Sequence, residues 1–343
     1  MLKTVLIASL LSGALASPSF AEGPHHHGGA PYRPDSSRYD NRNLVALGQR
    51  LFFDPVLSGS GETACASCHD PRYGYAEPRR VSIFDSGKHG PRNAPGLINA
   101  RYTPRLMLDG RFPSLEKQVS GPMQPNGEMG SSLAAAARRL DGDASYREHF
   151  FDVFHEPPAP GGIAAALAAF QRTLLSRTSR FDRFLCGKDE QALTRMERWG
   201  WEIFTTKGRC AGCHAVNARR SGFPLLTDFR FHNTGAAFDG SDFRDPGRYR
   251  VTLAERHLGS FRTPSLRNVA VTAPYMHNGS LRTLEDVVEF YDAGGRANPN
   301  LSPRMQPLDL SDEEKQALVA FLYSLTDEDY EAAHARLGPD GRR

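Results

Sequence analysis

The pentapeptide Cys-x-x-Cys-His occurs twice in this chain, at residues 65–69 and 210–214. In this pattern each cysteine can form a thioether bond to a haem vinyl group, and the histidine that follows is placed as the proximal ligand of the iron. Zinc ribbons and redox-active Cys-x-x-Cys sites are the alternatives, but zinc ribbons hold their cysteine pairs closer together and do not require the trailing histidine. The spacing therefore predicts two covalently bound c-type haems, attached through Cys65, Cys68, Cys210 and Cys213, with His69 and His214 as iron ligands.

The beginning of the chain has the pattern of a secretory signal peptide, which we predict over residues 1–21. Lys3 is followed by an apolar run from Val5 to Leu15, and small residues lead to Ala21. Such a run is too short to be a membrane anchor. Because haem is attached to Cys-x-x-Cys-His motifs in the bacterial periplasm, we expect the mature protein to be periplasmic.

Composition limits the number of domains and the kinds of partner. The 343 residues are enough for two domains with cores of their own, and a formal net charge of +3 is too small to indicate nucleic acid or a membrane as a partner. Residues 22–39 are rich in Gly, Pro, His and Ser, which predicts a disordered tail, and residues 331–343 are expected to form a second tail. The run His25–His27 is either a metal site or a solvated part of the first tail. Cys186, which the haems leave over, is predicted to be a small buried thiol.

A diverged repeat extends through the rest of the chain. Matched positions lie 169 residues apart without a gap, and they include the pairs Pro95/Pro264, Leu97/Leu266, Asn99/Asn268, Leu115/Leu284 and Val119/Val288. In addition, Gly48-x-x-x-Phe52 precedes the first haem motif as Gly200-x-x-x-Phe204 precedes the second. The repeat predicts two haem domains of common plan, at residues 40–160 and 190–330.

Apolar patterning predicts a mainly α fold with long ordered loops. Residues 161–189 are rich in Ala, Leu and Phe, and we expect them to form a helix that links the domains. Ser311-x-x-Glu314 is a capping box at the start of a helix that reaches Leu325, with an apolar face formed by Ala317, Leu318, Phe321, Leu322 and Leu325. The segments 70–114 and 216–274 are dense in Gly, Pro, Asn and Arg, and ordered loops of this length usually surround a cofactor or carry function.

The repeat also indicates that the two haems differ in their distal ligand. In the predicted helix 283–291, Tyr291 falls on the same face as Leu284 and Val288. The equivalent position in the first copy is Pro122, which has no ligand atom. If this position faces the iron, a phenolate closes the second haem and the first haem is open. The alternative is that Tyr291 is an ordinary core tyrosine.

With these features established, the chain resembles the bacterial di-haem cytochrome c peroxidase and MauG family over nearly the whole mature sequence. The resemblance is carried by Cys65-Ala-Ser-Cys-His-Asp-Pro71, Gly90-Pro-Arg-Asn93, Leu108-Asp-Gly-Arg111, Gly121-Pro122 through Glu128-Met129, Phe170-Gln-Arg-Thr-Leu174, Cys210-Ala-Gly-Cys-His214, Thr263-Pro-Ser-Leu-Arg-Asn268 and Pro274-Tyr-Met-His-Asn-Gly279. It implies two cytochrome c-like domains, with a peroxidatic haem in the N-terminal domain and an electron-transfer haem in the C-terminal domain.

The same resemblance implies roles for single residues of the first domain. It places Glu128 over the N-terminal haem, with Gln118 and Pro122 lining the same distal pocket. Without the resemblance, Glu128 would be read as a surface carboxylate, because acidic residues are common in loops.

A calcium ion between the haems is also implied by the resemblance. Its ligands would be Asn93 and the backbone carbonyls of Thr272 and Pro274. Oxygen ligands of this kind are those that a hard cation prefers.

Departures from the family pattern bear on function. One branch of the family has a methionine at the position of Tyr291, whereas the MauG branch has a tyrosine, so this chain resembles the latter. A hard anionic phenolate lowers the iron potential and suits the second haem to storing an oxidising equivalent. In this family a tryptophan usually opens the Trp-Asp-Gly-Arg motif, and this chain has Leu108 at that position. Gly208 occupies the position where the tryptophylquinone-forming member of the family has a surface tryptophan. Trp199 and Trp201 are expected to pack in the core.

Three functions are consistent with these residues. The first is a periplasmic peroxidase that reduces hydrogen peroxide at the N-terminal haem, with Glu128 moving the proton. It would share oxidising equivalents with the haem bound by His214 and Tyr291 and take electrons from a small donor, a cytochrome c or a cupredoxin. The second is a MauG-like maturation enzyme that oxidises side chains of a secreted partner protein. The third is a non-catalytic di-haem electron-transfer cytochrome, against which the open haem and Glu128 argue.

Overall fold

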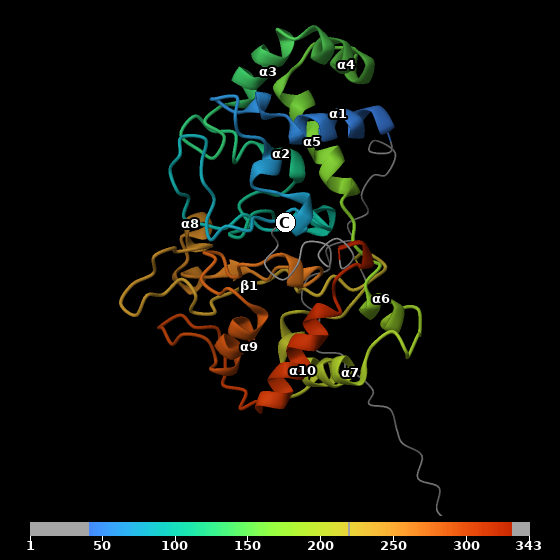
Figure 1. Ribbon diagram of the computed structural model, residues 1–343. Helices are drawn as coiled ribbons and strands as arrows, with labels where there is room; N and C mark the ends of the chain where they lie inside the picture. The colour runs from blue at the N-terminus through green and yellow to red at the C-terminus, as the bar shows by residue number, and fades with distance from the viewer. Residues whose placement is uncertain (1–40, 219, 331–343) are drawn as a thin grey trace, which may run out of the picture. The chain divides into compact units, whose positions relative to one another are not determined.

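A computed structural model describes residues 41–218 and 220–330 of the chain (Figure 1). The predicted signal peptide, the tail that contains His25–His27 and the C-terminal tail lie outside these residues. The described chain is mainly helical, with a first half at residues 41–173 and a second half at residues 180–330. No helix in the described ranges is long and apolar enough to cross a membrane.

The first half is built on a close crossing of two helices. Its helices are α1 (Arg42–Phe53), α2 (Leu115–Val119), α3 (Leu133–Asp141), α4 (Ala144–Phe154) and α5 (Pro160–Thr173). Helix α1 meets α5 at Gly48, where a β-carbon would lie 1.9 Å from the carbonyl oxygen of Ala166. Phe52, one turn further along α1, is buried, and its ring centroid lies 5.1 Å from that of Phe170. The spacing Gly48-x-x-x-Phe52 therefore combines a close backbone approach with a large core side chain.

The second half repeats this crossing. Its helices are α6 (Arg180–Leu185), α7 (Arg195–Thr205), α8 (Tyr249–Thr252), α9 (Leu284–Asp292) and α10 (Asp312–Tyr323). Helix α7 meets α10 at Gly200, where a β-carbon would lie 1.9 Å from the carbonyl oxygen of Ala317. The ring centroids of Phe204 and Phe321 are 5.1 Å apart. Figure 1 shows both crossings, α1 with α5 and α7 with α10, so the internal repeat is a repeat of structure.

Loop conformations repeat as well. Asn99 and Asn268 both adopt the left-handed backbone conformation, with φ of 61° and 58°, and so do Met107 and Met276, with φ of 65° and 68°. Each methionine lies in a tight loop that an antiparallel backbone bridge closes. A conformation shared by both copies indicates a structural role for the two methionines.

The segments 70–114 and 216–274 are long loops, as predicted. Apart from α8, they contain only short 3-10 turns and the two-residue strands β1 (Phe231–His232) and β2 (Phe261–Arg262). The strands pair antiparallel, with Phe231 opposite Arg262. These loops place polar groups beside both haem motifs.

The segment 161–189, which was expected to form one linking helix, forms two helices, so this prediction was wrong. Helices α5 and α6 are separated by residues 174–179. There the backbone exchanges two hydrogen bonds with Asn99, whose side chain accepts from the Ser176 N–H at 3.2 Å and donates to the Ser176 carbonyl at 3.1 Å. The Ser179 side chain then caps α6. Polar contacts of residues 174–179 thus end one helix and begin the next.

Helix α10 confirms the predicted capping box. The Ser311 hydroxyl accepts from the Glu314 N–H at 3.2 Å, and the Glu314 carboxylate accepts from the Ser311 N–H at 2.8 Å. The predicted apolar face is buried at Ala317, Leu318, Phe321, Leu322 and Leu325.

Two predictions of burial were wrong. Cys186 is exposed, because it follows the last turn of α6 instead of lying on its packed face. Trp199 is 37% exposed, because Gly200 faces α10 and each residue of a helix is turned about 100° from the next. Trp201 does pack in the core, with its ring centroid 4.9 Å from that of Phe181.

Candidate haem sites

The first Cys-x-x-Cys-His motif forms a tight turn around its histidine. Cys65 begins a 3-10 turn, and the His69 N–H donates to the Cys65 carbonyl at 2.9 Å. His69 Nδ1 lies 2.9 Å from the carbonyl oxygen of Tyr75. Because a carbonyl only accepts, Nδ1 carries the proton and Nε2 is left free for a metal. Burial lowers the pKa of His69 and keeps the imidazole neutral, the form that binds iron.

The second motif has the same geometry. The His214 N–H donates to the Cys210 carbonyl at 2.8 Å, and His214 Nδ1 lies 2.9 Å from the carbonyl oxygen of Leu226. Burial lowers the pKa of His214 too. Each site offers a neutral imidazole with a free Nε2 beside two cysteines, a donor set that fits a c-type haem.

The cysteines argue against redox sites and against one zinc ribbon. Burial raises the pKa of Cys65 and of Cys210 to about 12 and that of Cys68 to about 11. Redox-active cysteines have depressed pKa values instead. Moreover, Cys65 packs against the core of the first half and Cys210 against that of the second, so the two motifs do not form one zinc ribbon.

Helix α9 brings Tyr291 to the second haem motif. Leu284 and Val288 are buried on its inner face, and Tyr291 follows one turn later. Burial raises the pKa of the Tyr291 phenol, and the nearby sulfur atoms of Cys213 and Cys210 raise it further. No hydrogen bond joins the Tyr291 hydroxyl to any residue that the structure describes. The side chain is half-buried, so its hydroxyl is accessible to a ligand, and the role of Tyr291 as a ligand of the second iron stays a prediction.

The first haem motif faces a loop where the second faces a helix. Helix α2 ends three residues before Pro122, the counterpart of Tyr291, so Pro122 lies in the turn that follows. The Met129 N–H donates to the Pro122 carbonyl at 3.1 Å and closes this loop. Gln118, in α2, donates through Nε2 to the sulfur of Met107 at 3.6 Å. The early end of α2 therefore places Pro122, which has no ligand atom, in a turn and not on the face of a helix.

Glu128 lies within electrostatic reach of the first haem motif. Its charge adds to burial in raising the pKa of Cys65 and of Cys68. The side chain is half-buried, and its backbone carbonyl accepts from the Asp85 N–H at 2.8 Å. Burial raises the pKa of Glu128 itself, whereas the nearby Arg111 lowers it. Glu128 is thus positioned near the haem-attachment cysteines with a carboxyl that holds its proton more firmly than an exposed one.

A second carboxylate near this site had no signal in the sequence. Glu77 is fully buried, and its side chain accepts from the Ser82 hydroxyl at 2.5 Å and from Arg79 Nε at 2.7 Å. Its charge contributes to the raised pKa of Glu128. Only the folding of the long loop brings Glu77 here, so no spacing in the sequence could have identified it.

An acid–histidine pair beside the second motif was missed for the same reason. His232 Nε2 lies 3.0 Å from the Asp228 carboxylate, and this hydrogen bond raises the pKa of His232 to about 9. Ligand atoms of Cys213, Asp228 and His232 lie within 4.8 Å of one another, a grouping that can hold a metal ion when the thiol is free. Because Cys213 belongs to the haem motif, the pair is better understood as part of the haem surroundings.

The three expected calcium ligands come from both halves of the chain. The Asn93 N–H donates to the His277 carbonyl at 2.8 Å, which joins Asn93 to the segment that contains Thr272 and Pro274. Asn93 Nδ2 donates to two backbone carbonyls, at 3.0 and 2.7 Å. Among the described residues, no group donates to Asn93 Oδ1 or to the carbonyl oxygens of Thr272 and Pro274. Oxygens left free in this way suit a hard cation, and the calcium site stays a prediction.

The junction between the halves has an aliphatic residue at the position of the usual tryptophan. The Leu108 carbonyl accepts from the Arg262 N–H at 2.8 Å. Next to it, the rings of Phe261 and His277 stack with centroids 4.0 Å apart. Since an aliphatic side chain is not readily oxidised, Leu108 cannot carry an electron hole as tryptophan can. The structure also buries Gly208.

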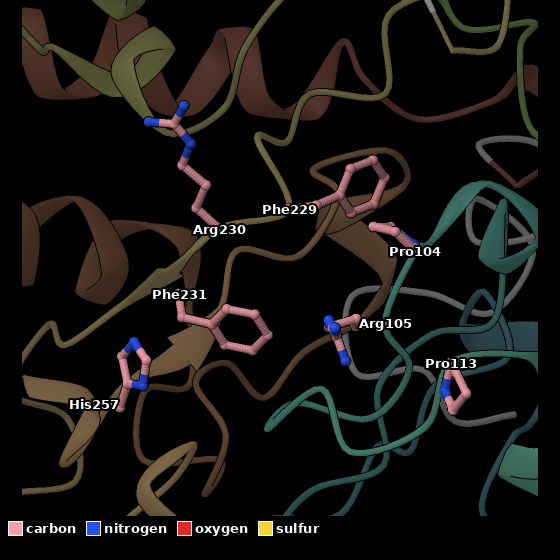
Figure 2. Close-up of a pocket in the computed structure, with 7 residues that line it drawn as sticks. All are labelled: Pro104, Arg105, Pro113, Phe229, Arg230, Phe231 and His257. Atoms are coloured by element: carbon pink, nitrogen blue, oxygen red, sulfur yellow. The ribbon is translucent and has the colours of Figure 1, made fainter. Parts of the chain in front are cut away.

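The cavity drawn in Figure 2 is an open surface feature that does not include the residues expected on the distal side of the first haem. It has a volume of about 590 Å³ and is lined by Pro104, Arg105, Pro113, Phe229, Arg230, Phe231 and His257. A second cavity of about 560 Å³ shares Pro104, Phe229 and Arg230 with it and extends to Gly212, inside the second haem motif. Neither includes Glu128 or Gln118. A lining with exposed arginines suits an anionic partner better than uncharged peroxide.

Comparison with known proteins gives a consistent result. The model of the di-haem cytochrome c peroxidase family matches residues 42–190, and the cytochrome c model matches residues 199–326. Methylamine utilization protein MauG of Methylorubrum extorquens is 36% identical over 300 residues, which cover 85% of this chain and 82% of that protein. Cytochrome-c peroxidase IdrP1 of Denitromonas iodatirespirans is 35% identical over 312 residues, which cover 82% and 81%.

Solved structures agree with these relatives. The crystal structure of a MauG-like protein associated with microbial copper homeostasis matches with a TM-score of 0.77 and 33% identity, over 91% of this chain and 96% of that one. The diheme peroxidase BthA of Burkholderia thailandensis matches with a TM-score of 0.74 and 29% identity, over 84% and 87%. The expected fold, mainly α with two cytochrome c-like domains, is confirmed.

Proposed function

The chain belongs to the di-haem cytochrome c peroxidase and MauG family, and we propose that this peroxidase-type oxidoreductase reduces hydrogen peroxide in the periplasm at the first of its two c-type haems. Oxidising equivalents are shared with the second haem. One observation carries the proposal, namely the asymmetry of the distal positions. A phenol without a hydrogen-bond partner among the described residues, Tyr291, lies at the second haem motif. Pro122 replaces it at the first, with the half-buried Glu128 nearby.

Glu128 moves the proton in this proposal. A haem held by Cys65, Cys68 and His69 would supply the iron chemistry for binding peroxide and cleaving its oxygen–oxygen bond. The Glu128 carboxylate takes the proton from one peroxide oxygen and delivers it to the other, which leaves as water. Overall, hydrogen peroxide, two protons and two electrons give two water molecules, and the electrons come from a small donor. The raised pKa of Glu128 suits a group that must both accept and return a proton.

His214 and Tyr291 bind the second iron in this proposal. Burial, with a smaller effect of the nearby Cys213 and Cys210, raises the pKa of the Tyr291 phenol, so the phenolate forms only when a metal displaces the proton. An anionic oxygen ligand then stabilises the higher oxidation state and lowers the iron potential. The second haem is therefore suited to hold an oxidising equivalent, and the fully oxidised protein reacts with peroxide without prior reduction.

We propose that the partner protein has an acidic contact surface. Arg105 and Arg230 are exposed in the cavity of Figure 2, and Arg220 is exposed in the adjoining cavity that reaches Gly212. None of the three arginines forms an ion pair with a described residue. Their unpaired charge lies close to the second haem motif, where a cytochrome c or a cupredoxin would deliver electrons.

A second candidate function is the oxidation of side chains in a secreted partner protein. Tyr291 and the relatives named MauG favour it. Leu108 and the buried Gly208 weigh against it, because this chain lacks a tryptophan at both positions. The third candidate, a non-catalytic electron-transfer cytochrome, leaves the absence of a distal ligand at Pro122 and the position of Glu128 without a purpose.

We also propose one calcium ion at Asn93, Thr272 and Pro274. Because these residues belong to different halves, the ion would strengthen the contact between the two haem domains.

A turnover assay of the mature holoprotein tests the proposed function. Hydrogen peroxide is mixed with a reduced small c-type cytochrome or a reduced cupredoxin, and oxidation of the donor is followed. We expect two donor molecules to be oxidised per peroxide. A maturation enzyme would instead leave these donors largely reduced and change the mass of a secreted partner encoded beside it. Absence of peroxide-dependent oxidation with either donor would contradict the peroxidase proposal.

A further inference from the structure

Arg262 carries a charge that no acidic residue neutralises in the described chain. Its Nε atom is fully buried and has no hydrogen-bond partner. The one side-chain hydrogen bond of its guanidinium goes from Nη1 to the Thr263 carbonyl at 3.3 Å. Burial lowers the pKa of Arg262 to about 10, and no carboxylate opposes this shift. Arg262 as a whole is half-buried, and a guanidinium keeps its proton at physiological pH, so a partly buried positive charge has one neutral acceptor among the described residues.

Acidic residues of the segments that border β2 are bound to other cations. Asp109 accepts from Arg92 at 2.7 Å and from Arg111 at 2.6 Å. Arg92 donates two hydrogen bonds to the Asp245 carboxylate, from Nε at 2.6 Å and from Nη2 at 3.0 Å. Asp228 is paired with the histidine of β1, opposite β2. A partly buried charge without a counter-ion is unfavourable, so the guanidinium of Arg262 favours the binding of a further anion.

The position of Arg262 connects it to the second haem. It lies on β2, and two residues later the backbone of Pro264 is a hydrogen-bond acceptor close to the His214 ring. On the other side, its N–H donates to the Leu108 carbonyl of the first half. Arg262 therefore lies where the second haem site meets the junction between the halves.

We propose that Arg262 is the counter-ion of a propionate group of the second haem. Haem carries two propionates, which are anionic at neutral pH, and the guanidinium is the side chain that binds a carboxylate through two parallel hydrogen bonds. The pair neutralises both the partly buried cation and one negative charge at the haem edge. Positive charge near the haem favours reduced iron, so Arg262 raises the potential of the second haem and opposes the effect of an anionic axial ligand. The inference requires a haem in the second site, but it requires neither Tyr291 as its ligand nor peroxide as its substrate.

Spectroelectrochemical titration of the mature holoprotein tests this inference, with the two haems followed by their separate optical signals. Arg262→Gln should move the potential of the second haem to a lower value and leave that of the first nearly unchanged. Arg256→Gln is the matched control, because it removes the same charge from an exposed residue of the same half. Equal potentials of the second haem in the Arg262→Gln and Arg256→Gln proteins would overturn the inference, and so would a shift confined to the first haem.

Arg262→Lys provides a second route if the glutamine variant does not fold. Lysine keeps the positive charge but cannot form the bidentate hydrogen bond to the propionate, so the potential of the second haem should stay near the wild-type value. The propionate bending band in the resonance Raman spectrum should shift, because a carboxylate loses a hydrogen bond. An unchanged band would show that Arg262 does not contact a propionate. Neither measurement depends on peroxide turnover. The inference about Arg262 can therefore fail while the proposed function holds, and the proposed function can fail while the inference holds.

Discussion

Glu128 experiences opposing effects on its pKa, and their balance suits proton transfer. Burial and the charge of Glu77 favour the protonated form, whereas the guanidinium groups of Arg111 and Arg92 favour the ionised form. Burial dominates, so the pKa lies above the ordinary value for glutamate. A carboxyl tuned in this direction is the kind that acts as an acid or base near neutral pH.

Replacing Glu128 by Gln tests the role of this carboxyl. The substitution keeps the shape of the side chain and removes the proton acceptor, so cleavage of peroxide should slow by about 10²–10⁴-fold, the range for lost general acid–base catalysis. Stopped-flow absorption of the ferric holoprotein mixed with peroxide measures the rate. Glu62→Gln, at an exposed loop residue before the first haem motif, is the control and should react like the wild type. An unchanged rate in Glu128→Gln would assign proton transfer to another group.

The pH dependence of the same reaction tests the electrostatic account. Glu128 accepts a proton only when ionised, so the rate is lost as the pH falls through its raised pKa. Arg111 lowers this pKa, and Arg111→Gln should therefore move the acid limb of the rate profile to higher pH. Arg111→Lys keeps the charge and should leave the limb near its wild-type position. A limb that moves to lower pH in Arg111→Gln would show that the titrating group is not Glu128.

At the residue scale, part of the candidate site was readable from the sequence. The haem cysteines and histidines follow from a fixed local spacing, and Tyr291 follows from the repeat combined with a helical period. Glu128 needed the family resemblance, because nothing local distinguishes it from a surface carboxylate. Glu77, near the first haem motif, and Arg262, proposed to bind a haem propionate, were not found at all, since the folding of long loops without a periodic pattern places them.

At the scale of helices, the distal asymmetry comes from a difference in length. Helix α9 has 9 residues and carries Tyr291 in its last turn. Its counterpart α2 has 5 residues, because Gly121 and Pro122 follow soon after its end. Two copies of one motif thus acquire different chemistry through the point at which a helix stops.

Helix prediction succeeded where side chains of the helix itself define its ends. The capping box of α10 lies at the predicted position, and α9 begins with a capping box that was not predicted. The prediction of one helix over residues 161–189 was wrong, because hydrogen bonds between the distant Asn99 and Ser176 interrupt an otherwise continuous apolar pattern. Tertiary contacts of this kind are invisible to local periodicity.

The crossing of α7 and α10 gives a prediction for stability. In Gly200→Ala the new β-carbon would lie 1.9 Å from the Ala317 carbonyl oxygen, so the helices must move apart. Overpacking of this kind costs about 1–3 kcal/mol, which should lower the Tm of the mature holoprotein by several degrees. Gly161→Ala in α5 is the matched control, because no atom lies within 4 Å of its β-carbon, and it should keep or slightly raise the Tm. Circular dichroism during heating measures both, and equal Tm values for the two variants would show that α7 tolerates a wider crossing.

At the scale of the whole chain, the two haem domains are coupled through buried polar contacts. Arg92 of the first half holds Asp245 of the second with two hydrogen bonds, at 2.6 and 3.0 Å, and also contributes to the pKa of Glu128. Asn93, the neighbouring residue, donates to the His277 carbonyl at 2.8 Å. Contacts with the second half therefore reach the carboxyl that is proposed to act at the first haem. The two-domain plan was readable from the repeat, whereas this junction was not, because the Arg92–Asp245 ion pair joins residues 153 positions apart.

The central claim is that the two haems differ in axial coordination, and electron paramagnetic resonance of the resting ferric holoprotein tests it most directly. Because Pro122 offers no ligand atom and Tyr291 does, we expect one high-spin and one low-spin haem in equal amounts. In Tyr291→Phe the low-spin signal should disappear, while the original high-spin signal should stay. Two low-spin signals in the wild type would contradict the account, since a side chain such as His89, which is exposed in this structure, would then have to close the first haem. A low-spin signal that persists in Tyr291→Phe would equally show that Tyr291 is not the ligand of the second haem.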